Sequence, residues 1–142
     1  LEKYKPDPND PIDILKKVGG FDIAAMAGVY LGAAYLKIPV VIDGFISAVA
    51  ALVAARLNPL ARDYMIPSHA SYEQGYSHAI KALELNPSLM LDMRLGEGSG
   101  CPLMFMIVEA ACAVITNMGT FKEAEIDDYY IESIMGIENY KI

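Results

Sequence analysis

The chain has 142 residues, a length that suits one domain with its own hydrophobic core. Hydrophobic residues make up 54% of it and charged residues only 20%, the opposite of the balance that disorder requires. With 11 Lys and Arg against 18 Asp and Glu, the net charge is −7, so the basic patch that a nucleic-acid groove or an anionic membrane surface needs is not expected.

The first half of the chain predicts three helices and one strand. Residues 1–11 carry three prolines and predict an extended lead-in. Asp10 as a cap followed by Pro11 predicts a helix to about Val18, which Gly19 and Gly20 end. Further along, the patterns predict a helix at 22–36, a buried parallel strand at 38–42 and an Ala-rich helix at 45–57, whose small face (Ala50, Ala51, Ala54, Ala55) should pack on a sheet.

The second half is less regular. The patterns predict a weaker strand at 63–68, a helix from 71–75 to about 85, a short helix at 88–94, a loop at 96–100, an apolar helix from Pro102 to about Met118 and an acidic helix from Lys122. The alternation of strands and helices indicates α/β packing with parallel strands. Because two strands cannot make a full sheet, the remaining strands are expected in a part of the protein that this chain lacks, or in a partner.

Two uncharged runs, at 23–36 and 44–55, raise the question of a membrane span. They are 14 and 12 residues long, whereas a span needs about 20, so buried core elements are expected and no membrane span. Ala24, Gly28 and Gly32 form a small-residue ridge at i, i+4 spacing, which would let another helix approach closely.

The cysteines and the first residue bear on location and completeness. Two cysteines without a secretory leader indicate a reducing, cytoplasmic compartment. On one helix Cys101 and Cys112 would lie about 16 Å apart, too far for a disulfide, so we expect two small buried thiols. A start on Leu1 rather than Met indicates a piece of something larger.

Three polar segments should meet at the carboxyl end of the strands, where α/β sheets bind ligands. They are Asp43 with Gly44 after the first strand, residues 68–71 after the second, and the glycine-rich loop at 96–100 before the long helix. Glycines at alternate positions and the N–H groups of a helix start would suit an anion. This convergence predicts a binding site.

For several of these residues a structural role competes with a functional one. Glu97 is either a base on the loop or the partner of the helix dipole. Asp43 binds a ribose hydroxyl or serves as a turn residue and cap. Ser68 and Ser71 bind phosphate or cap a helix. His69 lies at the pocket rim or, in the favoured interpretation, on the surface.

Histidine and cysteine spacings predict no metal site. His69 and His78 are nine residues apart, and Cys101 and Cys112 form no CxxC pair. We therefore expect no metal site.

Several motifs together resemble a known enzyme family. They are VGGFDIAAMAGVYLGAA (18–34), PVVIDGFISAVAALVAARL (39–57), DYMIPSHASYEQG (63–75) and MRLGEGSG (93–100), with Asp10-Pro11 ahead of them. In order and spacing they resemble the C-terminal half of nicotinate-nucleotide–dimethylbenzimidazole phosphoribosyltransferases, over about Asp10 to Glu123. The family transfers the phosphoribosyl group of nicotinate mononucleotide to 5,6-dimethylbenzimidazole or a similar base, giving α-ribazole 5′-phosphate and nicotinate for cobalamin.

The resemblance implies roles for particular residues. Glu97 is similar to the family's catalytic base, Ser71 to a phosphate-binding serine and Leu95 to an apolar wall of the base pocket. Asp43 and Gly44 resemble a segment that lines the ribose-phosphate site. Gly96 and Gly98, beside Glu97, complete the implied substrate-binding set. The resemblance also implies a homodimer and no cofactor.

The same resemblance implies fold and domain organisation. It predicts helices on a parallel, Rossmann-like sheet, present only as the C-terminal part, with flanking helices of a small helical subdomain. Residues 1–9 would be a lead-in, 10–120 the matched core and 121–142 an acidic helix or tail, of which 127–142 matched nothing. The family's N-terminal half, with its glycine-rich phosphate loops, is absent, so the chain alone should be inactive. The alternative is a non-catalytic binding or assembly subunit that keeps half of the fold.

Overall fold

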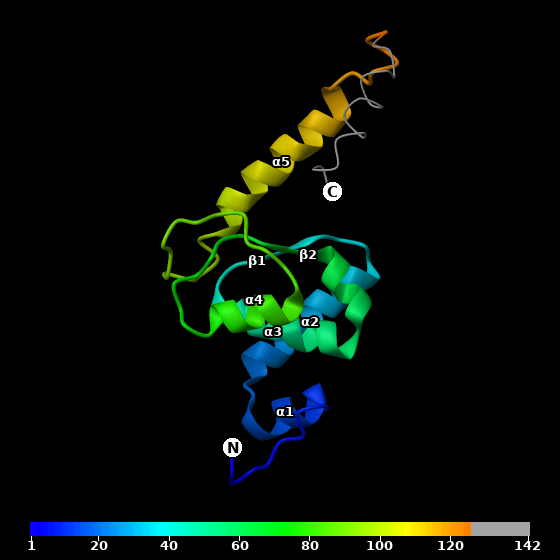
Figure 1. Cartoon of the computed structure of the whole chain (residues 1–142). Coiled ribbons are helices and arrows are strands. Elements are labelled where there is room, and N and C mark those ends of the chain that lie inside the picture. The colour runs from blue at the N-terminus through cyan, green and yellow to red at the C-terminus, as the bar shows by residue number, and fades with distance from the viewer. Residues whose placement is uncertain (126–142) are drawn as a thin grey trace, which may run out of the picture. The chain divides into compact units, whose positions relative to one another are not determined.

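The computed structural model of the chain describes residues 1–125 (Figure 1). The chain divides into two compact units, Leu1–Ile107 and Val108–Ile142. The elements in chain order are α1 (Pro11–Val18), α2 (Phe21–Tyr35), β1 (Val40–Ile42), α3 (Phe45–Leu57), the 3-10 helix η1 (Pro59–Tyr64), β2 (Met65–Pro67), α4 (Tyr76–Leu83) and α5 (Cys101–Asn117).

The two strands are parallel, as the sequence predicts. Val40 pairs with Met65 and Ile42 with Pro67, and the amide of Ser68 continues the ladder by donating to the Ile42 carbonyl at 2.9 Å. Two parallel strands with helices around them make a mixed α/β structure, so the predicted fold class is confirmed in the part of the chain that the structure describes.

The core of the first unit lies around α3. Ala48, Ala50, Ala51 and Ala54 are fully buried, and α3 contacts α2, α4 and η1. The predicted small face is therefore correct at three positions, whereas Ala55 is only half-buried. α3 also contacts β1, so it packs chiefly between helices and only in part against the sheet.

Local signals placed several boundaries correctly. The Asp10 carboxylate accepts from the amides of Ile12 and Asp13 at 2.9 and 3.1 Å and so caps α1. At the other end of the core, the Asn58 side chain accepts from the amide of Leu60. This second cap starts η1, which includes residues 63 and 64. The strand β2 is therefore shorter than the strand predicted at 63–68. The first strand is also shorter, since Ile38 and Pro39 are exposed and precede it.

The predicted helix at 88–94 is wrong. Leu89 instead forms a parallel bridge with His69: its amide donates to the Ser68 carbonyl at 3.1 Å, and its carbonyl accepts from the amide of Ala70 at 2.8 Å. These bonds join residues about twenty positions apart, so Leu89 forms an isolated bridge beyond the end of β2 in a segment that is otherwise irregular, with Asp92 at a φ of +50°.

The cysteines and the small-residue ridge also differ from expectation. Cys101 and Cys112 share α5 and are unpaired, but Cys101 is half-buried and Cys112 exposed, because residues 109–125 are exposed throughout. Burial raises the pKa of the Cys101 thiol, and the Asp43 carboxylate adds to the rise. At Gly28 and Gly32 no described atom outside the neighbouring residues and the backbone of α2 lies within 4 Å of where a Cβ would stand, so no other element of residues 1–125 packs on the ridge at these two positions.

Two further points concern the helices. No helix within residues 1–125 combines the length and the hydropathy needed to cross a bilayer. Residues 121–125 form turns, and the rest of the helix expected from Lys122 lies outside the described residues.

Candidate active site

The glycine-rich loop makes a left-handed turn at Glu97. Gly96, Glu97 and Gly98 have φ values of +72°, +55° and +76°. Glycine adopts this region freely, but for glutamate it costs about 1–2 kcal/mol. Hydrogen bonds from the Ser99 amide to the Gly96 carbonyl, and from the Cys101 amide to the Gly98 carbonyl, close the turn onto α5.

Asp43 holds this loop against the end of β1. Its Oδ2 accepts from the amide of Gly98 at 3.1 Å, and its Oδ1 accepts from the amide of Gly100 at 2.8 Å. The Asp43 carboxylate therefore binds the loop that leads into α5. The sequence suggested other roles for it, either binding a ribose hydroxyl or acting as a turn residue or cap for the next helix. Its side chain is nearly buried, which strengthens these charge-assisted bonds.

The carboxylate of Glu97 has no partner in the described part of the chain. Its side chain is exposed, and among residues 1–125 it makes no hydrogen bond or ion pair. Since Asp43 accepts from the amides of Gly98 and Gly100, Glu97 does not cap α5 by a hydrogen bond.

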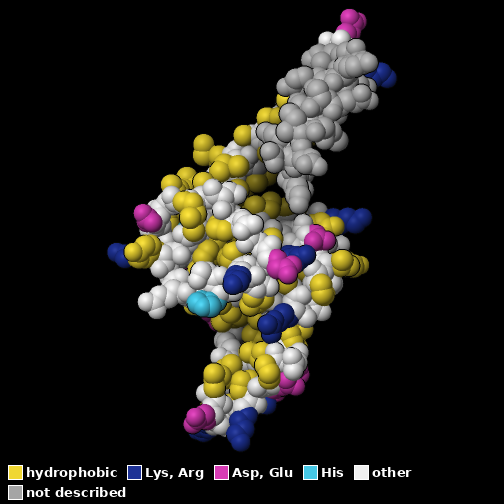
Figure 2. All heavy atoms as spheres, in the orientation of Figure 1, with side chains coloured by type: hydrophobic (Ala, Val, Ile, Leu, Met, Phe, Trp, Pro, Cys, Tyr) yellow, Lys and Arg dark blue, Asp and Glu magenta, His cyan; other side chains and the backbone are white. Residues whose placement is uncertain are grey.

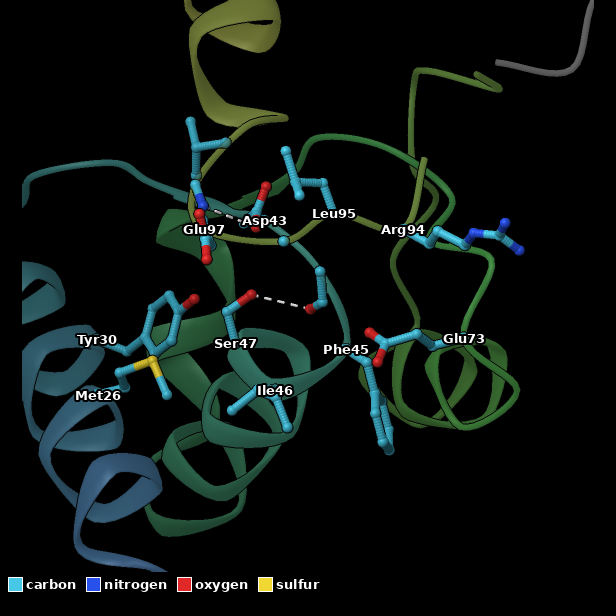
Figure 3. Close-up of a pocket in the computed structure, with 14 residues that line it drawn as sticks. Met26, Tyr30, Asp43, Phe45, Ile46, Ser47, Glu73, Arg94, Leu95 and Glu97 are labelled. Atoms are coloured by element: carbon cyan, nitrogen blue, oxygen red, sulfur yellow. Dashed lines mark hydrogen bonds between the residues drawn. The ribbon is translucent and has the colours of Figure 1, made fainter. Parts of the chain in front are cut away.

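The loop and the carboxyl end of β1 form one wall of a cavity of about 540 Å³, a size that is typical of small-molecule sites (Figure 3). The cavity is lined by Met26, Tyr30, Val41, Asp43, Gly44, Phe45, Ile46, Ser47, Glu73, Arg94, Leu95, Gly96, Glu97 and Gly98. Six of the seven predicted site residues are thus brought together. Ser71 lines a neighbouring cavity instead, although its Oγ lies 3.9 Å from where a Cβ on Gly44 would stand.

The polar lining of the cavity is mainly acidic. Asp43, Glu73 and Glu97 contribute three carboxylates, and Arg94 is the one cation among the described lining residues. Arg94 points away from Glu97 in Figure 3 and lies over the ring of Tyr72 at 5.9 Å. This lining suits a ligand that is or becomes cationic, whereas a phosphate would need more donors than it offers.

The opposite wall comes from α2 and α3 and is largely apolar. Met26 and Tyr30 reach the cavity from α2, and Phe45, Ile46 and Ser47 from the first turn of α3 (Figure 3). Burial raises the pKa of Tyr30 to about 12, so its phenol stays protonated. Such a wall suits a flat aromatic ligand with few polar atoms.

Several of these residues were missed from the sequence. Tyr30 stands in an uncharged run that predicted core, and a hydroxyl in the middle of such a run was the available signal. Glu73 follows Ser71 by two positions, so its carboxylate could have been included with that motif. Nothing local marked Met26, Phe45 or Ile46 as lining residues, because their neighbours on the chain are equally apolar.

His69 is the clearest error. It is 1% exposed rather than on the surface, because it follows β2 and bridges to Leu89 beneath the loop. Its ring is stacked with that of Tyr76, with centroids 6.5 Å apart. Ser68 is also fully buried and neither caps a helix nor faces the cavity; its Oγ donates to the Asp43 carbonyl at 3.2 Å.

No group of three or more His, Cys, Asp or Glu residues that could hold a metal ion occurs within the described part of the chain. The chemistry available at the cavity is therefore that of carboxylates, one arginine, hydroxyls and the amides of the loop.

A parallel strand end, a glycine-rich loop at a helix start and an exposed carboxylate beside a cavity make a candidate small-molecule site of the kind found at the carboxyl edge of α/β sheets. A family described as "Phosphoribosyltransferase" matches residues 1–126. A curated relative from Clostridium perfringens, a nicotinate-nucleotide–dimethylbenzimidazole phosphoribosyltransferase, is 56% identical over 140 residues, and one of the same description from Yersinia enterocolitica is 51% identical over 127. The chain belongs to this nicotinate-nucleotide–dimethylbenzimidazole phosphoribosyltransferase family.

The chain is a partial member of that family. The matches cover 99% and 89% of this chain but only 39% and 36% of the two relatives, so the chain spans less than two fifths of their length. The solved structure of the Thermus thermophilus enzyme of the same description matches with a TM-score of 0.79 and 39% identity, over 87% of this chain and 37% of the other. The 140-residue match also takes in most of residues 127–142, which the motifs alone had not placed.

Proposed function

We propose that this chain supplies part of the active site that transfers the phosphoribosyl group of nicotinate mononucleotide to 5,6-dimethylbenzimidazole or a similar base. The products are α-ribazole 5′-phosphate and nicotinate, for assembly of the cobalamin nucleotide loop. The observation that carries the proposal is the free carboxylate of Glu97 on a left-handed turn, at a cavity with an apolar opposite wall. The relatives are phosphoribosyltransferases that act on nicotinate nucleotide and dimethylbenzimidazole, and this activity of theirs suggests the reaction.

The reaction places a base where Glu97 stands. One ring nitrogen of the benzimidazole attacks C1′ of the ribose while the bond from C1′ to the nicotinate nitrogen breaks. The leaving nicotinate takes that electron pair, which neutralises its pyridinium, so no general acid is needed. The other ring nitrogen loses its proton to Glu97, and this general-base help contributes about 10²–10⁴ in rate. Displacement from the opposite face converts the β-nucleotide to the α-nucleotide.

The remaining predicted residues bind the substrates. Leu95 faces the base together with the apolar wall, and the backbone of Gly96 and Gly98 forms the edge of the site. Each carboxylate oxygen of Asp43 accepts one hydrogen bond from the loop. The remaining lone pairs can accept from a ribose hydroxyl beside Gly44. Ser71, in the neighbouring cavity, contacts the phosphate.

The acidic lining explains why this part alone is insufficient. A substrate phosphate next to Asp43 and Glu73 requires cationic groups or N–H donors beyond Arg94, and we infer that the rest of the relatives' length provides them. The whole enzyme needs no cofactor, acts as a homodimer and resides in the cytoplasm.

The direct experiment compares this chain with a full-length protein that contains it. Both are incubated with nicotinate mononucleotide and 5,6-dimethylbenzimidazole, and the product is identified by chromatography and by NMR of the anomeric proton. We expect the α-nucleotide from the full-length protein and none from the 142-residue chain. A full-length protein that binds a partner but forms no product would favour the alternative, a non-catalytic assembly subunit.

A further inference from the structure

A buried serine–histidine pair lies directly behind the loop that carries Glu97. Ser68 is 0% and His69 is 1% exposed, and both follow β2. His69 Nδ1 lies 2.9 Å from the Ser68 Oγ and 3.9 Å from Asp43 Oδ1. The proposed reaction makes no use of either side chain, yet both are buried polar groups, and His69 Nε2 has no hydrogen-bond partner among the described residues.

The single hydroxyl proton of Ser68 has two neighbouring acceptors, the Asp43 carbonyl at 3.2 Å and His69 Nδ1 at 2.9 Å. We infer that the proton goes to the carbonyl and that His69 donates from Nδ1 to Ser68 Oγ, because only this arrangement satisfies both contacts at once. His69 fixes the rotamer of Ser68, and Ser68 fixes the backbone of Asp43.

The same chain of contacts reaches the part of the loop that directly follows Glu97. The Asp43 carboxylate accepts from the amides of Gly98 and Gly100. A Cβ on Gly100 would stand 2.2 Å from His69 Nδ1 and 2.6 Å from Ser68 Oγ, so the loop backbone is seated directly on the pair. A left-handed glutamate needs support from its surroundings, and since its side chain makes no hydrogen bond within residues 1–125, that support has to act on the loop backbone.

We propose that His69 is a positioning residue for Glu97, acting through Ser68 and Asp43 to hold the loop in its left-handed turn. The proposal rests on the proposed function, because it assigns a purpose to the placement of Glu97. It predicts that losing the Nδ1–H donor lets the loop move, and a displacement of about 1 Å at a catalytic group costs about 10²-fold in rate.

The first test separates hydrogen bonding from packing. In the full-length protein, His69→Leu removes the donor and keeps an apolar filling, whereas His69→Asn places an amide N–H where Nδ1 stands. We expect kcat to fall about 10–100-fold in His69→Leu, with the KM of both substrates within a few-fold, and to recover substantially in His69→Asn. His78→Leu, on the exposed face of α4, is the matched control and should leave kcat unchanged.

A folding defect is handled by a second variant. Ser68→Ala removes the atom between His69 and Asp43 with little change in volume, and it should lower kcat in the same sense. Equal losses in His69→Leu and His69→Asn, or a normal kcat in Ser68→Ala, would overturn the proposal.

The second readout does not depend on catalysis. Amide hydrogen exchange at Gly98 and Gly100, measured on the 142-residue chain without substrate, should speed up at least about tenfold in Ser68→Ala, and the amides of α3 should stay unchanged. Unchanged exchange at both glycines would refute the positioning role even if the full-length enzyme is active. Faster exchange with no product from the wild-type full-length protein would instead retain the positioning and reject the proposed function.

Discussion

Asp43 shows how a single residue can serve a distant element. From the sequence it was equally a ribose ligand or a local cap, because a strand end followed by a helix is compatible with both. The structure shows a third arrangement, in which its carboxylate caps the loop before α5, 57 positions away from it at Gly100. A contact over that distance leaves no local signal, which is why the sequence could nominate the residue but not its partner.

Tyr30 provides a test of burial in the cavity wall by pH. Its pKa is raised to about 12 because burial disfavours the phenolate. The pKa of Tyr30 is higher in the folded state, at about 12, than in the unfolded state, at about 10. The contribution of Tyr30 to the free energy of unfolding is therefore complete below pH 10 and is lost as the pH rises through about 12. We expect the free energy of unfolding to fall over that window by on the order of 2 kcal/mol from this residue.

Chemical denaturation across the alkaline range measures this effect. Tyr30→Phe should flatten the decline, whereas Tyr35→Phe, on the exposed end of α2, should not. Tyr76, whose pKa burial also raises to about 12, accounts for the decline that remains in Tyr30→Phe. Identical alkaline profiles for the wild type and Tyr30→Phe would show that Tyr30 is not buried as described.

At the scale of elements, local signals and tertiary pairings differ in how well they can be predicted. The bounds of α1 and α3 followed from Asp10-Pro11, Gly44 and Asn58-Pro59, because caps and breakers act on neighbouring residues. The segment at 88–94 was assigned the wrong structure because its pairing partner, His69, lies elsewhere in the chain. The position of the site was predicted because the carboxyl ends of parallel strands converge. That rule does not say which helices face the strand ends, since tertiary packing decides this, and so the walls of the cavity were not predicted.

Two glycines in different elements make a matched pair of substitutions. Gly100→Ala forces a Cβ against His69 and Ser68 and should destabilise the chain by about 1–3 kcal/mol. Gly28→Ala enters open space in the middle of α2 and should stabilise it by about 0.5–1 kcal/mol, because alanine is the better helix former. Denaturant unfolding of both variants decides this, and a destabilising Gly28→Ala would show that another surface covers the ridge.

At the scale of the whole molecule, much apolar surface is uncovered. Figure 2 shows hydrophobic side chains exposed over the displayed face, and on α5 Phe105 and Met106 are 52% and 68% exposed. In the relatives, which are more than twice as long, additional chain is available to cover such surface.

A homodimer would cover part of it as well. We expect the full-length protein, and to a lesser degree this chain, to associate, because large exposed apolar areas are unfavourable in water. Light scattering at micromolar concentration measures the mass directly. A monodisperse monomer of the full-length protein would contradict the homodimer.

The central claim, that Glu97 is the base of a phosphoribosyl transfer, is tested most directly by Glu97→Gln in the full-length protein, with turnover and thermal melting measured side by side. Glutamine keeps the shape but not the proton affinity, so turnover should fall by about 10²–10⁴-fold while substrate binding and melting persist. Glu109→Gln, which removes an exposed carboxylate on α5, should change neither. Near-normal turnover in Glu97→Gln, with stability lowered by about 0.3–1 kcal/mol, would instead make Glu97 a partner of the helix dipole and remove it from the mechanism.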